Sequence, residues 1–245
     1  MRRTIGVIGG MGPAATVDFF RRIVDSTAAA TDQDHLHVIV DNQPAVPDRT
    51  AFIRGEGPDP TETLIAAAHR LESAGADLLV MACNTAHVCA PAIADAVSTD
   101  FVNWIEVAAR GVRERLPEAR SVALFATEGT IAAGLYQQVF AALGIQVILP
   151  DAAGQAAINA AIYGPEGVKA GPPSLDPARW LVDAVGQRLA AAGADCALLA
   201  CTELSALYDR PADWGIPVFD AAQLVAEHVI ELAGARVKGL QDAAV

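Results

Sequence analysis

Two cysteines lie in closely similar stretches of this 245-residue chain. Cys83 belongs to MACNTAH, residues 81–87, and Cys201 belongs to LACTEL, residues 199–204. The preceding segments, RLESAGAD and RLAAAGAD, repeat with the same offset of 118 residues (201 − 83). A lone buried cysteine is usually a packing residue. Two cysteines at equivalent places of a duplicated unit instead predict a pair of thiols that share one chemical task.

Each cysteine follows an apolar run and precedes a segment that can begin a helix. Amides and the dipole at a helix start are expected to bind carboxylates and to lower a thiol pKa of about 8.5 toward neutrality. If a pseudo-twofold axis relates the two units, Cys83 and Cys201 face each other. Such a pair suits removal of a proton from one face of a carbon and delivery to the other, which inverts a stereocentre without any cofactor.

Short apolar runs alternate with longer segments of helical period, which predicts β-α units and parallel sheets covered on both faces. A second offset, of 117 residues, aligns residues 5–12 with 122–129. We therefore predict an α/β fold of two similar doubly wound parallel-sheet lobes, related by pseudo-twofold symmetry, with the active site in the cleft between them. Helices are expected to begin at Pro13, Thr61 and Thr130. Strands are expected at residues 4–8, 36–41, 77–82, 121–126, 145–149, 195–200 and 216–219, with a further one near Phe101.

Two long loops differ from the short connections elsewhere. Residues 42–60 contain Arg49, and residues 163–177 contain Lys169. Open parallel sheets bind ligands at the carboxyl ends of their strands, where such loops gather. Both loops are expected to carry ligand-binding groups.

Composition excludes several classes of function. A net charge of −12 and 5% aromatic residues argue against nucleic-acid binding. No apolar run is long enough to span a membrane, and glycines interrupt the apolar segment after Arg2 and Arg3, which argues against a signal peptide. A cytoplasmic protein with reduced cysteines is expected. No metal site is expected, since Cys83 and Cys89 lack zinc-ligand spacing, and Cys89 and Cys196 are interpreted as packing residues.

Six collinear motifs together resemble the aspartate racemases of the aspartate/glutamate racemase superfamily. They are GGMG (9–12), PDRT (47–50), CNTAH (83–87), ATEGT (126–130), GVKAG (167–171) and CTE (201–203). The resemblance implies a bilobal, pyridoxal phosphate-independent isomerase that needs no cofactor and forms a homodimer. It also implies that Cys83 and Cys201 are the catalytic acid/base pair, acting at the Cα of aspartate.

The resemblance also implies how the substrate is held. Arg49 and Lys169 match the cationic groups of the pocket, and an arginine can hold a carboxylate through two parallel hydrogen bonds. Two positive groups in an acidic protein suit a small amino dicarboxylate. The substrate's α-carboxylate, its ammonium group and its remaining contacts are assigned to Asn84, Thr85, Thr127, Thr130, Thr202 and Met11.

Two further residues have more than one possible role. His87 lies four residues after Cys83 and either touches the thiolate or the ligand, or is a helix histidine satisfied by the backbone. Glu203 either orients Cys201, accepts the substrate ammonium, or caps a helix.

The resemblance suggests a division of the chain in which the C-terminus returns to the first lobe. The first lobe is expected to contain residues 1–104 and 214–245, with Cys83. The second is expected to contain residues 105–213, with Cys201.

Other functions remain open at this stage. A dinucleotide-binding enzyme is one alternative, with the glycines of residues 9–12 at the phosphates and Asp41 as the ribose acceptor. The spacing of these glycines does not fit the dinucleotide-binding fingerprint. Glutamate racemisation, maleate isomerisation and arylmalonate decarboxylation belong to the same superfamily, but Arg49 and Lys169 favour an amino dicarboxylate. A non-enzymatic bilobal protein that binds small molecules is a further alternative. It would not explain the matched cysteine pair, because binding alone needs no thiols.

Overall fold

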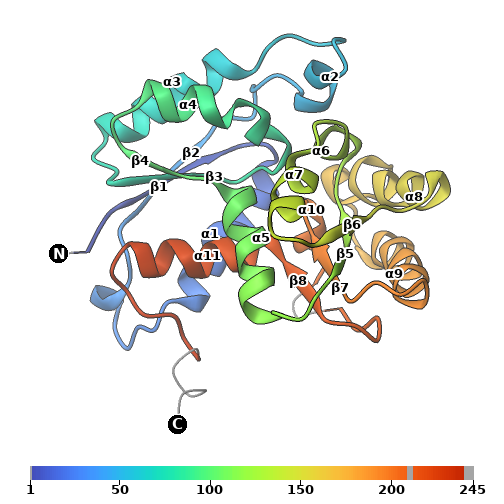
Figure 1. Ribbon diagram of the computed structural model, residues 1–245. Coiled ribbons are helices and arrows are strands. Elements are labelled where there is room, and N and C mark those ends of the chain that lie inside the picture. The colour runs from blue at the N-terminus through green and yellow to red at the C-terminus, as the bar shows by residue number, and fades with distance from the viewer. Residues whose placement is uncertain (1, 209–211, 240–245) are drawn as a thin grey trace.

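The protein contains two four-stranded parallel sheets with the same strand order, β2-β1-β3-β4 and β6-β5-β7-β8. The computed structural model describes residues 2–208 and 212–239. In Figure 1 the first sheet lies on the left and the second on the right, with helices around both. The predicted fold of two doubly wound lobes is confirmed, whereas a cleft between them stays a prediction.

The first sheet is built around β1 and β3, whose residues are all buried. In register, Ile5 of β1 lies beside Val38 of β2 and Leu78 of β3. Its elements, in chain order, are β1 (Ile5–Gly9), α1 (Pro13–Ser26), η1 (Asp32–Asp34), β2 (Val38–Asn42), α2 (Arg49–Ile53), α3 (Thr61–Ser73), β3 (Leu78–Met81), η2 (Thr85–Cys89), α4 (Ala90–Ala96), β4 (Asp100–Val102) and α5 (Trp104–Arg115).

The second sheet repeats this plan with β5 and β7 at its centre. Val122 of β5 lies beside Val147 of β6 and Cys196 of β7. Its elements are β5 (Ser121–Phe125), α6 (Glu128–Ala132), α7 (Leu135–Ala142), β6 (Gln146–Ile148), α8 (Ala152–Tyr163), η3 (Val168–Ala170), α9 (Asp176–Ala191), β7 (Cys196–Leu199), α10 (Thr202–Ser205), β8 (Val218–Asp220) and α11 (Ala221–Leu232).

Every predicted strand is present, including the one near Phe101. The expected helix starts at Pro13 and Thr61 are confirmed. The third expectation is wrong by two residues, because α6 begins at Glu128. Thr127 caps this helix by accepting a hydrogen bond from the Thr130 amide at 3.2 Å, so Thr130 lies inside its first turn.

The C-terminal strand belongs to the second sheet, not to the first as expected. In β8, Val218 lies beside Ala197 of β7. This strand completes the second sheet as β4 completes the first, and β4 and β8 begin at positions offset by 118 residues (218 − 100). The helix α11 packs against α1 and α5. The remaining lobe boundaries, near residues 104 and 213, stay predictions.

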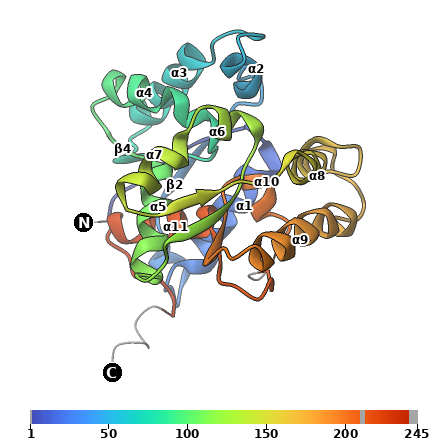
Figure 2. The ribbon, with the colours of Figure 1, turned by 45° about the vertical axis from the view of Figure 1, so that its right-hand side comes forward.

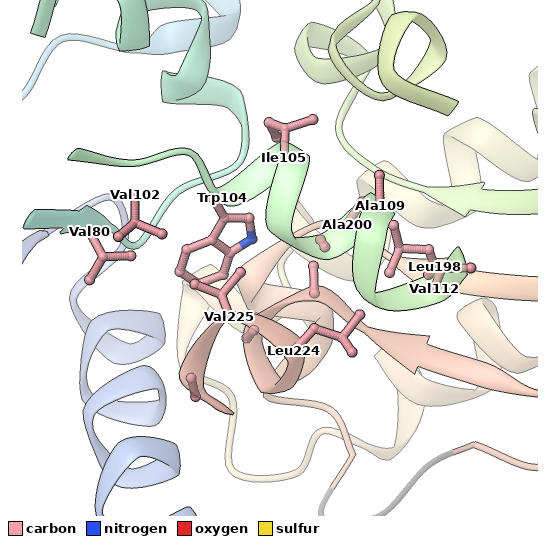
Figure 3. Close-up of a cluster of buried hydrophobic side chains, with 14 of the residues drawn as sticks. Val80, Val102, Trp104, Ile105, Ala109, Val112, Leu198, Ala200, Leu224 and Val225 are labelled. Atoms are coloured by element: carbon pink, nitrogen blue, oxygen red, sulfur yellow. The ribbon is translucent and has the colours of Figure 1, made fainter. Parts of the chain in front are cut away.

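One hydrophobic core joins the two sheets through α5 and α11, which lie between them (Figure 1). Trp104, the first residue of α5, is fully buried. Figure 3 shows its indole between Val80 and Val102 of the first sheet and Val225 of α11. Its ring centroid lies 4.8 Å from that of Phe19. The two lobes are thus packed on a shared hydrophobic interior.

Replacing Trp104 by alanine is expected to lower the free energy of unfolding by about 3–5 kcal/mol, because the change leaves a cavity in the shared core. Urea unfolding followed by circular dichroism measures the loss. Trp180 is the matched control, since it is 71% exposed, and its replacement by alanine is expected to change the stability by no more than about 0.5 kcal/mol. Equal effects at the two positions would contradict the shared core.

Within the described residues, no helix is both long enough and apolar enough to cross a membrane.

Candidate active site

The two cysteines occupy equivalent turns, each two residues beyond the end of a central strand. Cys83 follows β3 and Cys201 follows β7. The residue before each cysteine is held in the same way: the Ala82 amide donates to the Ile8 carbonyl at 2.9 Å, and the Ala200 amide donates to the Phe125 carbonyl at 2.8 Å. Both cysteines are buried, at 6% and 4% exposure. The duplicated sequence therefore produces a duplicated local geometry.

The expectation that a helix start lowers both thiol pKa values is wrong for Cys201. Burial raises the pKa of Cys201 well above its usual value, and the neighbouring Glu203 carboxylate raises it further, while Lys169 opposes the shift. The helix that follows, α10, has only four residues. Such a short helix has a weak dipole, and it does not offset the loss of hydration around a buried thiolate.

Glu203 lies at the centre of the polar contacts around Cys201. Its Oε2 accepts hydrogen bonds from the Cys201 thiol at 3.2 Å and from the Thr202 hydroxyl at 3.3 Å. Its Oε1 accepts from Lys169 Nζ at 2.5 Å and from the Gly12 amide at 3.1 Å. The hydrogen bond to the thiol fits the first of its expected roles, orientation of Cys201, and acceptance of the substrate ammonium stays a prediction. Glu203 also connects the second lobe to the start of α1 in the first.

Replacing Glu203 by glutamine is expected to lower the pKa of Cys201, because the change removes a negative charge beside the thiol and leaves the Lys169 charge unneutralised. The pH dependence of alkylation by iodoacetamide, read from the Cys201 peptide by mass spectrometry, measures the shift. Cys196 is the internal control: burial raises its pKa to about 12, and the substitution is expected to leave that value unchanged. An unchanged or raised midpoint for Cys201 would contradict this assignment.

Arg49 and Lys169 approach one backbone atom from two directions. The carbonyl of Met11 accepts from Arg49 NH2 at 3.4 Å and from Lys169 Nζ at 3.5 Å. Lys169 is already paired with Glu203, a pairing that the sequence did not predict. Among the ion pairs of the described residues Arg49 does not appear, and its buried Nε has no hydrogen-bond partner. Arg49 NH1 also donates to the Val46 and Pro47 carbonyls at 3.2 and 3.0 Å, so Nε is the nitrogen of its guanidinium that remains open to an anion.

The helix α2 places Arg49, which is its first residue. In Figures 1 and 2, α2 lies over α6 of the second lobe. Arg54, which directly follows α2, forms an ion pair with Glu128 of α6, and Asn159 of α8 donates to the same carboxylate at 2.5 Å. The segment that carries Arg49 is therefore fastened to the opposite lobe.

Three threonine hydroxyls from the two lobes form a closed cluster. Thr85 lies 2.9 Å from both Thr127 and Thr130, and the latter two are 3.1 Å apart. All three residues are buried. Nearby, the Tyr136 hydroxyl of α7 donates to Asn84 Oδ1 at 2.6 Å, which leaves the buried Nδ2 of Asn84 without a partner. A ligand that accepts a hydrogen bond would satisfy this amide.

His87 contacts the backbone rather than the Cys83 thiol. Its Nδ1 lies 2.8 Å from the Cys83 carbonyl, and its Nε2 accepts from the Trp104 amide at 3.1 Å. The only tautomer that fits both contacts carries its proton on Nδ1. Burial lowers the pKa of His87 to about 4, so the ring is neutral at physiological pH. Of the two roles that the sequence left open, the structure shows the histidine satisfied by backbone.

Sequence reasoning missed two tyrosines of the site. One is Tyr136, whose hydroxyl binds Asn84. The other is Tyr163, which ends α8 just before the loop that contains Lys169. The Lys169 Nζ lies 5.8 Å from the centroid of the Tyr163 ring. Burial raises the pKa of Tyr163, and the acidic groups of Cys201, Glu203 and Cys83 add to the shift. Tyr163 therefore borders the polar groups around Lys169. The chain has only three tyrosines. The signal that the sequence offered was the position of Tyr163 at the border of a loop predicted to bind the ligand.

The other two cysteines lie in the packed interior, as predicted. Cys196 is fully buried and Cys89 is 4% exposed. The Cys89 sulfur accepts a hydrogen bond from the Thr61 hydroxyl at 3.3 Å. In residues 2–208 and 212–239, no three His, Cys, Asp or Glu side chains gather in a way that could hold a metal ion.

Comparison with known proteins identifies the family. The model of the Asp/Glu/Hydantoin racemase family matches residues 8–229. The chain belongs to this family. It is 29% identical over 238 residues to the broad specificity amino-acid racemase RacX of Bacillus subtilis (strain 168), covering 92% of this chain and 96% of that protein. The chain is therefore an amino-acid racemase, an isomerase.

Solved racemase structures share its fold. The aspartate racemase of Picrophilus torridus has a TM-score of 0.84 and 30% identity, with 96% of each chain covered. The glutamate racemase of Campylobacter jejuni subsp. jejuni has a TM-score of 0.65 at 15% identity, covering 96% of this chain and 88% of that one, a likeness of fold alone. The arrangement of two parallel sheets is thus shared by racemases for different amino acids.

Proposed function

We propose that this racemase interconverts L- and D-aspartate without a cofactor, with Cys83 and Cys201 as its two acid/base groups. The observation that carries the proposal is the pair of buried thiols on equivalent turns of the two lobes. A base on one face of Cα and an acid on the other invert the centre through a planar carbanion. The likeness to an aspartate racemase at 30% identity supports the choice of substrate.

The surroundings of Cys201 suggest how one direction of the reaction begins. Its raised pKa keeps Cys201 protonated in the free protein, ready to donate. In this direction the Cys83 thiolate takes the α-proton as the Cα–H bond breaks, and the Cys201 S–H bond supplies the new proton from the opposite face, which leaves Cys83 as the thiol and Cys201 as the thiolate. The reverse direction starts from these protonation states. When it begins from the free protein, Cys201 first passes its proton to the Glu203 carboxylate 3.2 Å away and the Cys83 thiolate takes up a proton from water.

The substrate carboxylates are assigned to the two cations of the site and to the unpartnered amide of Asn84. The guanidinium of Arg49 takes one carboxylate, and the amide Nδ2 of Asn84 donates to the same ligand. Lys169 binds the second carboxylate while sharing its charge with Glu203. Thr85, Thr127, Thr130, Thr202 and the Met11 carbonyl form the polar surroundings of the ligand.

Access to the thiols requires movement. Cysteines that are 6% and 4% exposed cannot be reached by an amino acid in this conformation. We propose that the lobes separate, or that the segments of α2 and Tyr163 move aside, and that closure then excludes water from the carbanion.

A racemase of broad specificity is the second candidate. The pairing of Lys169 with Glu203 favours it, because only Arg49 is left as an unpaired cation for a single α-carboxylate. It is also the function printed for the Bacillus subtilis relative.

A substrate panel separates the two candidates. Dialysed protein without added pyridoxal phosphate is offered L-aspartate, L-glutamate, L-alanine and L-lysine, and the D-enantiomers are measured by chiral chromatography. We expect turnover of aspartate to exceed that of alanine and lysine by at least about 100-fold, as a lost charge-assisted pair implies. Comparable turnover of all four would overturn the aspartate assignment in favour of broad specificity. Racemisation of none of them would overturn both candidates.

The predicted cytoplasmic location and homodimer also stay proposals. Sedimentation equilibrium tests the latter: a mass near 51 kDa, twice the 25.4 kDa of the chain, is expected, and a monomer would contradict it.

A further inference from the structure

We propose that His87 and Ser205 are equivalent positioning residues, each of which joins the backbone of one active-site cysteine to the start of the long helix after the edge strand. The inference rests on the proposed two-cysteine function. It assigns each residue to one thiol, and therefore to one enantiomer.

The duplicated sequence places the two residues at matching positions. Each lies four residues after a cysteine, and their separation equals the offset of the repeat (205 − 87 = 118). Their side chains differ so much that sequence comparison alone hides the correspondence. The equivalence appears only in what the two side chains contact.

In the first lobe the link passes through the imidazole ring. His87 donates from Nδ1 to the Cys83 carbonyl at 2.8 Å and accepts at Nε2 from the Trp104 amide at 3.1 Å. Trp104 is the first residue of α5, directly after the Asn103 cap. One buried neutral ring thus fixes the Cys83 turn against the start of α5.

In the second lobe the link passes through a hydroxyl and a carboxylate. The Ser205 amide donates to the Cys201 carbonyl at 3.1 Å, and its hydroxyl lies 3.4 Å from the same oxygen. That hydroxyl donates to Asp220 Oδ1 at 2.6 Å. Asp220 is the cap of α11 and accepts from the Ala222 amide at 2.8 Å. The Cys201 turn is thereby fixed against the start of α11.

A buried arginine makes the second link rigid. Arg22 of α1, which is 8% exposed, donates to the Ser205 carbonyl at 2.8 Å and pairs with Asp220 Oδ2 at 3.0 Å. Asp18 holds the same guanidinium through Nε at 2.6 Å. Both anchored helices pack against each other in the shared core (Figure 3). The two turns are therefore positioned relative to one common body.

Positioning matters because proton transfer requires a short and well-aligned approach, and a displacement of about 1 Å can cost roughly 100-fold in rate. Loss of one link displaces one thiol and slows the proton transfer that this thiol performs. Rates alone cannot tell which thiol is affected, because the equilibrium constant of one makes kcat/KM equal for both enantiomers. Isotope effects can identify the displaced thiol, because the slowed proton transfer becomes more rate-limiting for the enantiomer whose proton that thiol removes.

The test measures the primary deuterium isotope effect on kcat/KM with α-deuterated L- and D-aspartate. His87→Leu and Ser205→Ala are expected to lower kcat by about 10-fold to 100-fold. Each is expected to raise the isotope effect for one enantiomer only, and the two variants for opposite enantiomers. His87→Asn, which retains a donor near Nδ1, and Ser205→Thr, which retains the hydroxyl, are expected to restore at least part of the rate.

The outcomes separate this inference from the proposed function. If the wild type racemises aspartate but both variants affect both enantiomers equally, or the same enantiomer, the positioning roles are wrong while the racemase stands. If the wild type racemises no aspartate, the proposed function itself fails. Should His87→Leu not fold, Ser205→Ala still tests the inference, because an isotope effect raised for one enantiomer only supports it and one raised for both overturns it.

Discussion

Replacing either Cys83 or Cys201 by serine is expected to reduce the inversion of aspartate by at least about 1,000-fold. A serine hydroxyl is a far weaker acid than a thiol, so it cannot exchange protons with Cα at neutral pH, and the loss of one general acid or base removes up to about 10⁴-fold of rate. Chiral chromatography of the product measures the effect.

The equivalence of the two turns makes this prediction symmetric. Both cysteines are buried, and each turn is held by a strand hydrogen bond of the same kind. Cys89→Ser is the matched control, because this buried cysteine packs in the same hydrophobic cluster as Cys83 and its sulfur accepts a hydrogen bond from Thr61. It is expected to keep the activity within about 10-fold of wild type, provided that it folds. A Cys83 or Cys201 variant that retains normal inversion would remove that thiol from the mechanism.

Replacing Arg49 by glutamine is expected to reduce kcat/KM for aspartate by about 100-fold to 1,000-fold. The guanidinium has a buried Nε without a partner, and in the proposed function it holds a substrate carboxylate through two charge-assisted hydrogen bonds, which contribute about 3–4 kcal/mol. Most of the loss is expected in KM, because the carboxylate is bound equally in the substrate and in the carbanion.

A lysine at position 49 provides the control for this prediction. Arg49→Lys keeps the positive charge but loses the fork geometry, so an intermediate loss is expected. Initial rates at several aspartate concentrations separate KM from kcat. A glutamine variant with the KM of wild type would show that Arg49 does not bind the substrate.

Much of the fold could be predicted from sequence, because its signals are local. Apolar runs such as residues 78–81 and 196–199 predict buried parallel strands wherever they occur, and the repeat predicts that the two sheets are alike. The sheet membership of β8 was not predictable in this way. It depends on pairing between Val218 and Ala197, which no local pattern records.

The site shows the same division between local and distant information. The two cysteines and Arg49 stand in recognisable motifs, so their positions followed from the sequence. The partner of Lys169 did not, because Glu203 lies 34 residues further along the chain and meets it only in the folded protein. The raised pKa of Cys201 follows from burial of the thiol and from the Glu203 carboxylate beside it, neither of which the helix start alone indicates.

In the proposed mechanism one group removes a proton from one face of Cα and a different group delivers a proton to the other face. The position of deuterium after early turnover tests this mechanism most directly. Wild-type protein in deuterium oxide is given L-aspartate, and both enantiomers are separated and examined by mass spectrometry before a tenth of the substrate is consumed. We expect deuterium at Cα in nearly all of the D-aspartate and little in the remaining L-aspartate. D-aspartate that retains the original proton would show that a single group removes and returns it, and would contradict the two-thiol mechanism.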